Sequence, residues 1–248
     1  MFQSQNDYIF EWLPRKGEYL SELLQAEGRP ANPTCFICRQ QEGIWKCLDC
    51  LGRPTHCRTC SIQVHSLLPF HRVERWNGAF FKPAWLWQAG LIIHLGHSGV
   101  PCPNAIASVL DTANAPDDSL DHNGHLEELE FPKGSDDQGN PLLIVVDRTG
   151  IHTVAIQWCS CLAAPSHDLQ LLQFQMFPAS FRSIKTAFTF QVLDDFLTDN
   201  RECKTSAMNY FSKLRRLTTN TFPHTVPVSL HVHLDCQNHT LSRTDTAS

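Results

Sequence analysis

Residues 35–71 read CFICRQQEGIWKCLDCLGRPTHCRTCSIQVHSLLPFH, a stretch with three Cys-x2-Cys pairs followed by two histidines. These eight residues are Cys35, Cys38, Cys47, Cys50, Cys57, Cys60, His65 and His71. Eight thiol and imidazole groups are what two tetrahedral zinc ions need, because a closed structural site takes four protein ligands. The stretch therefore predicts a small module that holds two Zn²⁺ ions.

Two ligand pairings fit this spacing. In a cross-brace, the first and third Cys-x2-Cys pairs share one zinc, and the second pair shares the other zinc with His65 and His71. In a consecutive arrangement, neighbouring pairs bind together and form two tandem sites. We favour the cross-brace, although spacing alone leaves both open. Turn-forming residues such as Gly43, Gly52 and Pro54 suit the sharp reversals that either arrangement requires.

A disulfide framework is the main alternative for a chain with eleven cysteines. The first residues, MFQSQNDYIFEW, have neither a basic segment nor an apolar core, so we expect no signal peptide. Thiols in a reducing compartment at such spacing indicate metal binding. His71 is the least certain ligand, because it follows Phe70 and also fits the pattern of a packed histidine.

The composition is that of a globular protein, with 42% apolar residues. No apolar run approaches the roughly 18 residues that a membrane span requires, so we expect no membrane partner. The formal charge of −5 is unevenly distributed, because residues 104–140 contain nine acidic residues against the single Lys133. Glycines and prolines interrupt the same stretch, which predicts a disordered acidic insertion.

These patterns divide the chain and predict an α+β fold. A small cross-braced zinc module packs on a small antiparallel sheet and a helical hairpin, and the acidic insertion interrupts the second part. The expected boundaries are an N-terminal helix at 8–30, the zinc module at 33–76, an α+β region at 77–103 and 141–222, the insertion at 104–140, and a weakly ordered tail at 223–248.

A third metal site is predicted in the α+β region. Residues 142–161 are typical of a hairpin around Asp147-Arg-Thr-Gly150, and side chains of its second run alternate between two faces. Cys159 and Cys161 would then project from the same side. They supply half a tetrahedron, and His97 and Cys102 in a Gly/Pro-rich loop are the candidates for the other half. Two ordinary buried cysteines are the alternative.

Two amphipathic helices are expected at 186–197 and 206–217, joined by a short connection and packed as a helical hairpin. The second helix is basic. Its cations favour either contact with phosphates or an ordinary solvated surface.

The order of these features resembles the cysteine-cluster domain associated with KDZ (Kyakuja-Dileera-Zisupton) transposases, which are abundant in fungal genomes. The matching segments include Trp12 with Tyr19-Leu20, Pro69-Phe70-His71-Arg72-Val73, Leu95-Gly96-His97, Trp158-Cys159-Ser160-Cys161, Thr186-Ala187-Phe188-Thr189-Phe190 and Leu214-Arg215-Arg216-Leu217-Thr218. The Cys-x-Cys at Cys159 and Cys161 matches the element for which such domains are named. Residues 35–71 are separately similar to a B-box zinc module, a protein-interaction fold.

The resemblance implies an accessory module of a transposase, which binds DNA, the transposase core or another protein. A DDE-type catalytic core would need separated carboxylates that hold two Mg²⁺ ions. The family pattern ends near Pro227 without such a core, and Asp194 and Asp195 are adjacent on one expected helix. We therefore expect a chain truncated before the catalytic core, without enzymatic activity, located in the nucleus.

Two other functions remain open. A B-box or RING-like interaction module is the first, and the two histidines at the end favour the B-box order over a RING ligase. The second is an enzyme that uses the metal of His97, Cys102, Cys159 and Cys161. Four protein ligands would leave that metal no open position for water, which argues against catalysis. The sequence leaves the oligomeric state open.

Overall fold

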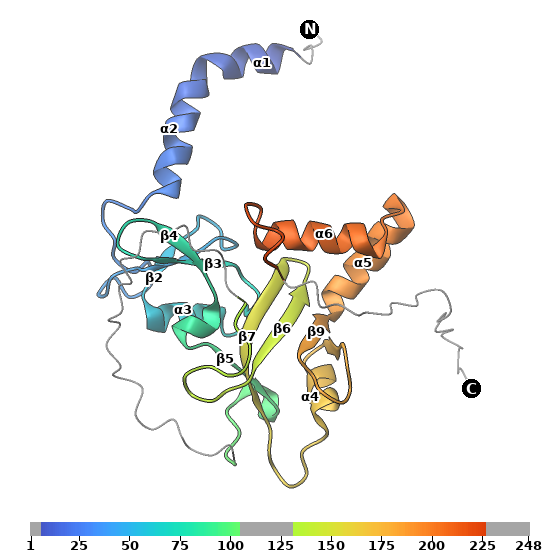
Figure 1. The fold of residues 1–248 in the computed structure, drawn as a ribbon. Coiled ribbons are helices and arrows are strands. Elements are labelled where there is room, and N and C mark those ends of the chain that lie inside the picture. The colour runs from blue at the N-terminus through green and yellow to red at the C-terminus, as the bar shows by residue number, and fades with distance from the viewer. Residues whose placement is uncertain (1–5, 105–130, 227–248) are drawn as a thin grey trace, which may run out of the picture.

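The computed structural model describes residues 6–104 and 131–226, and Figure 1 shows their arrangement. The elements in chain order are α1 (Asp7–Trp12), η1 (Leu13–Arg15), α2 (Lys16–Glu27), β1 (Trp45–Cys47), β2 (Thr55–His56), α3 (Arg58–His65), β3 (Val73–Trp76), β4 (Phe81–Ala84), η2 (Leu86–Ala89), β5 (Ile92–Leu95), η3 (His97–Gly99), β6 (Leu142–Asp147), β7 (Gly150–Trp158), α4 (His167–Gln173), β8 (Met176–Pro178), β9 (Thr186–Thr189), α5 (Phe190–Cys203) and α6 (Ala207–Thr218). This α+β arrangement confirms the predicted fold class.

The first sheet is small, antiparallel and ordered β2-β1-β3-β4. Trp45 and Val73 pack with Leu86, Ala89 and Leu91 into a compact apolar cluster, and Ile62 of α3 lies against it. We call this sheet together with α3 and the loop at 33–44 the Cys/His module. Its core is small for a folding unit, so other interactions must contribute to its stability.

The second sheet has the order β5-β7-β6-β9-β8. β6 pairs antiparallel with β7, and β8 pairs antiparallel with β9. The pairs β5–β7 and β6–β9 are parallel, so the sheet is mixed where we expected a purely antiparallel one. Parallel neighbours need long crossover connections, and the chain provides one between β5 and β7 and another between β6 and β9. We call this sheet with α4, α5 and α6 the five-stranded unit.

The β6–β7 hairpin is formed as predicted, with Arg148 and Thr149 in its turn. Val154 and Ile156 point into one apolar cluster with Trp158 at its edge, as the alternation predicts. Leu171 of α4 closes this cluster. The opposite face of the sheet is also buried, because α5 and α6 cover it.

One helix boundary was predicted wrongly. Residues Thr186–Thr189 form strand β9 between β6 and β8, and the helix begins only at Phe190. The Thr189 hydroxyl accepts a hydrogen bond from the backbone N–H of Val192, which makes it the N-cap of α5. The Ser206 hydroxyl caps α6 in the same way through Asn209. The two helices are consecutive and in contact, as the predicted helical hairpin requires.

The acidic insertion is only partly described. Residues 105–130 and the predicted weak strand around Leu230, Val232 and Leu234 lie outside the described residues. Residues 131–140 are ordered, contrary to our expectation, because the Asp136 carboxylate accepts hydrogen bonds from the backbone N–H groups of Gln138 and Asn140. Within the described part of the chain, no helix is both long and apolar enough to span a membrane.

Candidate metal centres

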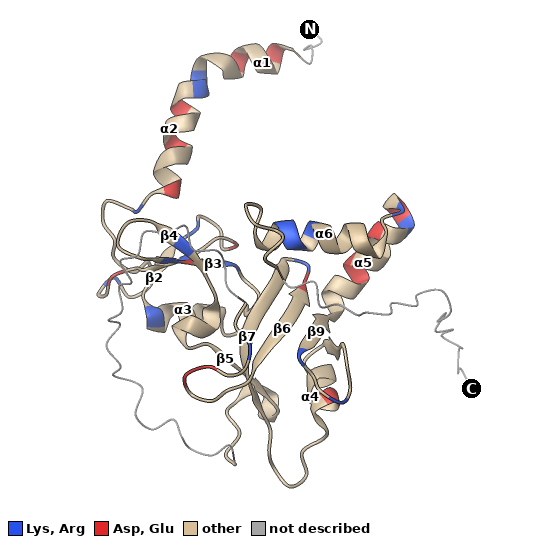
Figure 2. Cartoon of the chain, in the orientation of Figure 1, with Lys and Arg blue, Asp and Glu red and all other residues tan. Residues whose placement is uncertain are grey.

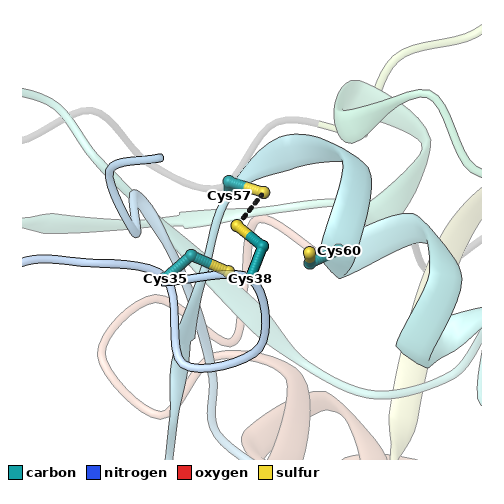
Figure 3. Close-up of side chains that lie close together, drawn as sticks. All are labelled: Cys35, Cys38, Cys57 and Cys60. Carbon is teal, nitrogen blue, oxygen red and sulfur yellow. Dashed lines mark hydrogen bonds between the residues drawn. The ribbon is translucent and has the colours of Figure 1, made fainter. Parts of the chain in front are cut away.

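The first centre lies between the loop before β1 and the start of α3. Cys35 and Cys38 come from the loop, and Cys57 and Cys60 come from the N-cap and first turn of α3 (Figure 3). Their sulfur atoms all lie within 4.8 Å of one another. The Cys38 and Cys57 sulfurs are 3.9 Å apart. Ligands placed about 2.3 Å from a central tetrahedral ion are separated by about 3.8 Å, so the spacing fits one metal ion.

The loop that carries Cys35 and Cys38 is shaped by its backbone. The Cys35 N–H donates to the Gln41 carbonyl, and the Arg39 N–H donates to the Cys35 carbonyl. Arg39 adopts a left-handed conformation with φ of 53°, which turns the chain back towards β1. This reversal places both sulfurs of the pair on the side that faces α3.

The second centre lies at the other end of α3. It consists of Cys47 at the end of β1, Cys50 in the following turn, His65 at the end of α3 and His71 before β3. His71 Nδ1 lies 3.5 Å from both Cys47 Sγ and Cys50 Sγ, and His65 Nε2 lies 3.7 Å from Cys50 Sγ. His65 Nδ1 donates to the Ser61 carbonyl, at 2.8 Å. That bond leaves Nε2 as the acceptor nitrogen, which is the form that binds a metal ion.

The two centres alternate along the chain. The first and third Cys-x2-Cys pairs meet in one group, and the second pair meets the two histidines in the other. This is the cross-braced grouping, and the consecutive pairing would need sulfurs that the structure places in different groups. The ten cysteines of the described residues are all free thiols, so no disulfide framework is present among them.

The third centre lies where β5 and β7 end side by side. Leu95 pairs with Trp158, so the residues after each strand, His97 and Cys159, emerge at the same edge. His97 Nε2 is 3.3 Å from the sulfurs of both Cys159 and Cys161. Cys102 Sγ completes the group at 3.8 Å from Cys159 Sγ and 3.6 Å from Cys161 Sγ. The four residues predicted from the sequence are therefore together.

Two features shape this third centre from outside. Gly96 has φ of +115°, and a Cβ atom there would lie 2.7 Å from the Cβ of Cys159. Gln170 of α4 is fully buried, accepts a hydrogen bond from the Cys159 N–H and donates to the Cys159 carbonyl. Sequence reasoning missed Gln170, because a lone glutamine inside an amphipathic helix gives no signal of its partner.

The thiols differ in how readily they ionise. Burial raises the pKa of the Cys35 thiol, but backbone N–H groups, first that of Cys57, outweigh this effect and lower the pKa to about 6. The backbone N–H of Ser160 is the main cause that lowers the pKa of Cys102 to about 5. The Cys161 thiol shares its proton with Cys102, which raises the pKa of Cys161 to about 11. The first and third centres each therefore present one ready thiolate, the form that binds metals.

The second centre has a further supporting pair. Asp49, between Cys47 and Cys50, accepts hydrogen bonds from the guanidinium and the backbone N–H of Arg72, which follows His71. Burial raises the pKa of the Asp49 carboxyl, but the hydrogen bonds from Arg72 outweigh it, so the net shift is downward. Sequence reasoning missed this pair, although the position of each residue next to a ligand could have indicated it.

Each of the three groups could hold one metal ion. Their donor sets are four thiols, two thiols with two imidazoles, and three thiols with one imidazole. Four protein donors make a closed tetrahedron, which is the arrangement of structural rather than catalytic sites. Soft thiolate donors with imidazole favour zinc among the abundant divalent ions.

Comparison with known proteins yields one match. The family model described as "CxC2 like cysteine cluster associated with KDZ transposases" matches residues 121–222. No curated protein and no solved structure matches the chain. The matched segment contains Cys159 and Cys161 of the third centre, whereas His97, Cys102 and the Cys/His module precede it. Residues 121–222 therefore carry a CxC2-like cysteine cluster of the family associated with KDZ transposases, as the resemblance indicated.

Proposed function

We propose that the chain is a zinc-stabilised accessory module that binds DNA for a KDZ-type transposase of fungal origin. The observation that carries this proposal is the presence of three Cys/His groups, one of which contains the Cys-x-Cys of the family segment. In this proposal each group binds one Zn²⁺ ion, and the catalytic core of the transposase is a separate part. The module acts in the nucleus, where its DNA substrate is.

The zinc ions have a structural role in this proposal. Zinc binding contributes on the order of 10 kcal/mol to the folding of a small metal-dependent module. The Cys/His module, with its small apolar cluster, needs such a contribution. Because four protein ligands close each site, we assign no catalytic step to any of the three ions.

We also propose that the chain has no catalytic activity of its own. Its carboxylates of interest already have structural partners. Asp147 accepts hydrogen bonds from the hydroxyls of Thr149 and Thr189. Asp195 accepts one from the Tyr210 hydroxyl, at 2.6 Å.

A cluster of arginines supports DNA as the ligand. The C-terminal end of α6, with Arg215 and Arg216, lies beside the β6–β7 turn that carries Arg148 (Figure 2). The two segments are joined by a hydrogen bond from the Ile151 N–H to the Thr218 hydroxyl. Arg215 Nε is a buried donor without a hydrogen-bond partner in the structure. Guanidinium groups gathered in this way match the geometry of phosphate oxygens.

The test is fluorescence anisotropy with a labelled duplex of mixed sequence and the zinc-loaded protein. We expect binding that weakens steeply as salt rises, because phosphate contacts release counterions. Arg148→Ala with Arg216→Ala should weaken binding about tenfold and reduce the salt dependence by about two contacts. Arg201→Ala with Lys204→Ala is the control, since both residues are exposed cations at the far end of α5. Equal losses in the two double variants, or no binding at low salt, would overturn the DNA assignment.

A protein-interaction module is the second candidate, and exposed apolar side chains on the Cys/His module favour it. Phe36 and Ile37, between the cysteines of the first pair, are 62% and 50% exposed, and Leu51 is fully exposed. Apolar groups at loop tips suit contact with another protein. Unchanged duplex binding in Phe36→Ser, together with loss of binding to a purified KDZ transposase core, would place this function beside DNA binding.

A further inference from the structure

The N-terminal helices form an arm that buries none of its residues. α1, η1 and α2 contain no buried side chain. In Figure 1 the arm extends away from the rest of the protein. Nine large apolar side chains on it are at least 37% exposed, namely Tyr8, Ile9, Phe10, Trp12, Leu13, Tyr19, Leu20, Leu23 and Leu24. A concentration of exposed apolar groups on this scale marks an interaction surface.

The base of the arm is held firmly on the Cys/His module. The buried Lys46 ammonium donates to the carbonyls of Ala26 and Glu27 at the end of α2, at 3.0 and 3.2 Å. Arg53 pairs with the Glu27 carboxylate. A cation at the C-terminal carbonyls also stabilises the helix dipole. The direction of α2 is therefore fixed by the module, and its apolar side chains are presented rather than loose.

The apolar side chains lie on one side of the arm and repeat symmetrically. The backbone stays in the right-handed helical region at the junctions on either side of η1. At helical periodicity, positions 8, 9, 12, 13, 19, 20, 23 and 24 form one stripe, and Asp7, Glu11, Arg15, Glu18 and Glu22 lie on the opposite side. The stripe reads the same in both directions from Lys16. A surface of this kind is complementary to itself when two copies run antiparallel.

We propose that the arm binds the arm of a second copy of this chain, antiparallel and about a two-fold axis that passes close to Lys16. The pairing places Tyr8 opposite Leu24, Ile9 opposite Leu23, Trp12 opposite Leu20 and Leu13 opposite Tyr19 of the second copy. The bend of the arm at Pro14 lies close to the axis, so the bends of the two copies coincide. This dimer is independent of the proposed function and of the metal content.

The size of the stripe is sufficient for a stable contact. Four aromatic and five aliphatic side chains, about half exposed, offer on the order of 800 Å² per copy, which is the per-partner area of a standard interface. An isolated helix of this length is marginal in water, so the pairing would also stabilise the arm itself.

Charges at the edge and centre of the stripe fit the same arrangement. Arg15 and Glu18 pair within one chain, at 3.0 Å. In the antiparallel dimer each also lies beside the opposite charge of the second copy, so the signs alternate along that edge. Lys16 lies at the centre of the stripe, where a single lysine fixes register at a cost in affinity.

The test is sedimentation equilibrium of the metal-loaded protein over a wide range of micromolar concentrations. We expect a dimer for the wild type and a monomer for Leu20→Ser with Leu23→Ser. Both residues are more than half exposed, so the variant should keep its fold and its zinc content. Lys16→Leu should tighten the dimer about tenfold, because the buried like charges are removed. Met208→Ser, an exposed apolar residue on α6, is the control and should stay dimeric.

The antiparallel register has its own readout. A photoreactive benzoylphenylalanine in place of Trp12 should cross-link to the neighbourhood of Leu20 in the second copy. Cross-links to the neighbourhood of Trp12 itself would overturn the antiparallel arrangement. A wild-type protein that stays monomeric at every concentration, or a dimer that survives Leu20→Ser with Leu23→Ser, would overturn the proposal as a whole.

Discussion

Arg72 connects Asp49 of the second metal centre to the C-terminus of α6. Its guanidinium binds the Asp49 carboxylate, with a shortest contact of 2.5 Å, and also donates to the Leu217 carbonyl, at 3.0 Å. Arg72 follows His71, and Phe70 on the other side accepts a hydrogen bond from the Thr149 hydroxyl. The segment that carries a ligand of the second centre therefore also joins the Cys/His module to the five-stranded unit.

This connection predicts a large effect for a conservative change. Arg72→Lys removes the forked contact with Asp49 and the bond to Leu217, and it leaves a carboxylate that is mostly buried with a weaker partner. We expect a loss of about 2 kcal/mol in the free energy of unfolding, measured by urea denaturation of the zinc-loaded protein.

The control for this variant is Arg53→Lys. Arg53 also pairs with an acidic residue, Glu27, but both side chains are about half exposed or more. Its effect should stay below about 0.5 kcal/mol, since exposed pairs contribute little. Similar losses for the two variants would show that Arg72 acts as an ordinary surface cation.

Gly96 predicts a test of the third centre that leaves every ligand intact. Gly96→Ala places a methyl group against the Cβ of Cys159 at a left-handed position, so it should displace Cys159 and abolish one metal site. Elemental analysis should show one zinc fewer per chain. Gly139→Ala is the matched control, because Gly139 also has positive φ, of +82°, but open space around it. If Gly139→Ala lost zinc as well, backbone strain and not the contact with Cys159 would be the cause.

His152 predicts a pH dependence of stability. It is buried between the two parts of the structure, and burial lowers its pKa to about 4, below the ordinary value of 6.5. Between these two values the unfolded chain takes up a proton that the folded protein refuses. Stability is therefore greatest above pH 6.5 and falls as the pH drops towards 4, by about 3 kcal/mol in total.

The contribution of His152 can be separated from that of the metal ligands by comparison. His152→Gln keeps a donor for the Thr149 hydroxyl, which lies 2.9 Å from His152 Nε2, but it cannot titrate. The difference in unfolding free energy between the two proteins, measured by urea denaturation from pH 7.5 down to about pH 4.5, should shrink by the contribution of one proton. Parallel pH profiles would contradict this account.

The ligand groups could be predicted from the sequence because their chemistry is local. A Cys-x2-Cys pair fits one ion whatever surrounds it, and the alternation of the β7 strand was enough to place Cys159 and Cys161 together. Metal binding at these residues stays a prediction. The sequence could not predict the pairing of Leu95 with Trp158, which brings His97 to Cys159, because register between distant strands depends on the whole sheet.

The failures have similar causes. Thr186–Thr189 was predicted as helix because Phe188 continues the apolar stripe of α5, and a short apolar run fits a strand equally well. The order at 131–140 depends on hydrogen bonds to Asp136, which composition does not reveal. The exposure of the N-terminal arm was also not predictable, since an amphipathic pattern indicates an apolar face but does not say what covers it.

The central claim is that three closed zinc sites stabilise this chain, and zinc per chain on the purified protein tests it most directly. We predict three zinc ions for the wild type and two for Cys159→Ser with Cys161→Ser. Cys203→Ser should keep three, because Cys203 is exposed and belongs to none of the three groups. Two zinc ions in all three proteins would contradict the third site and leave Cys159 and Cys161 as ordinary free cysteines.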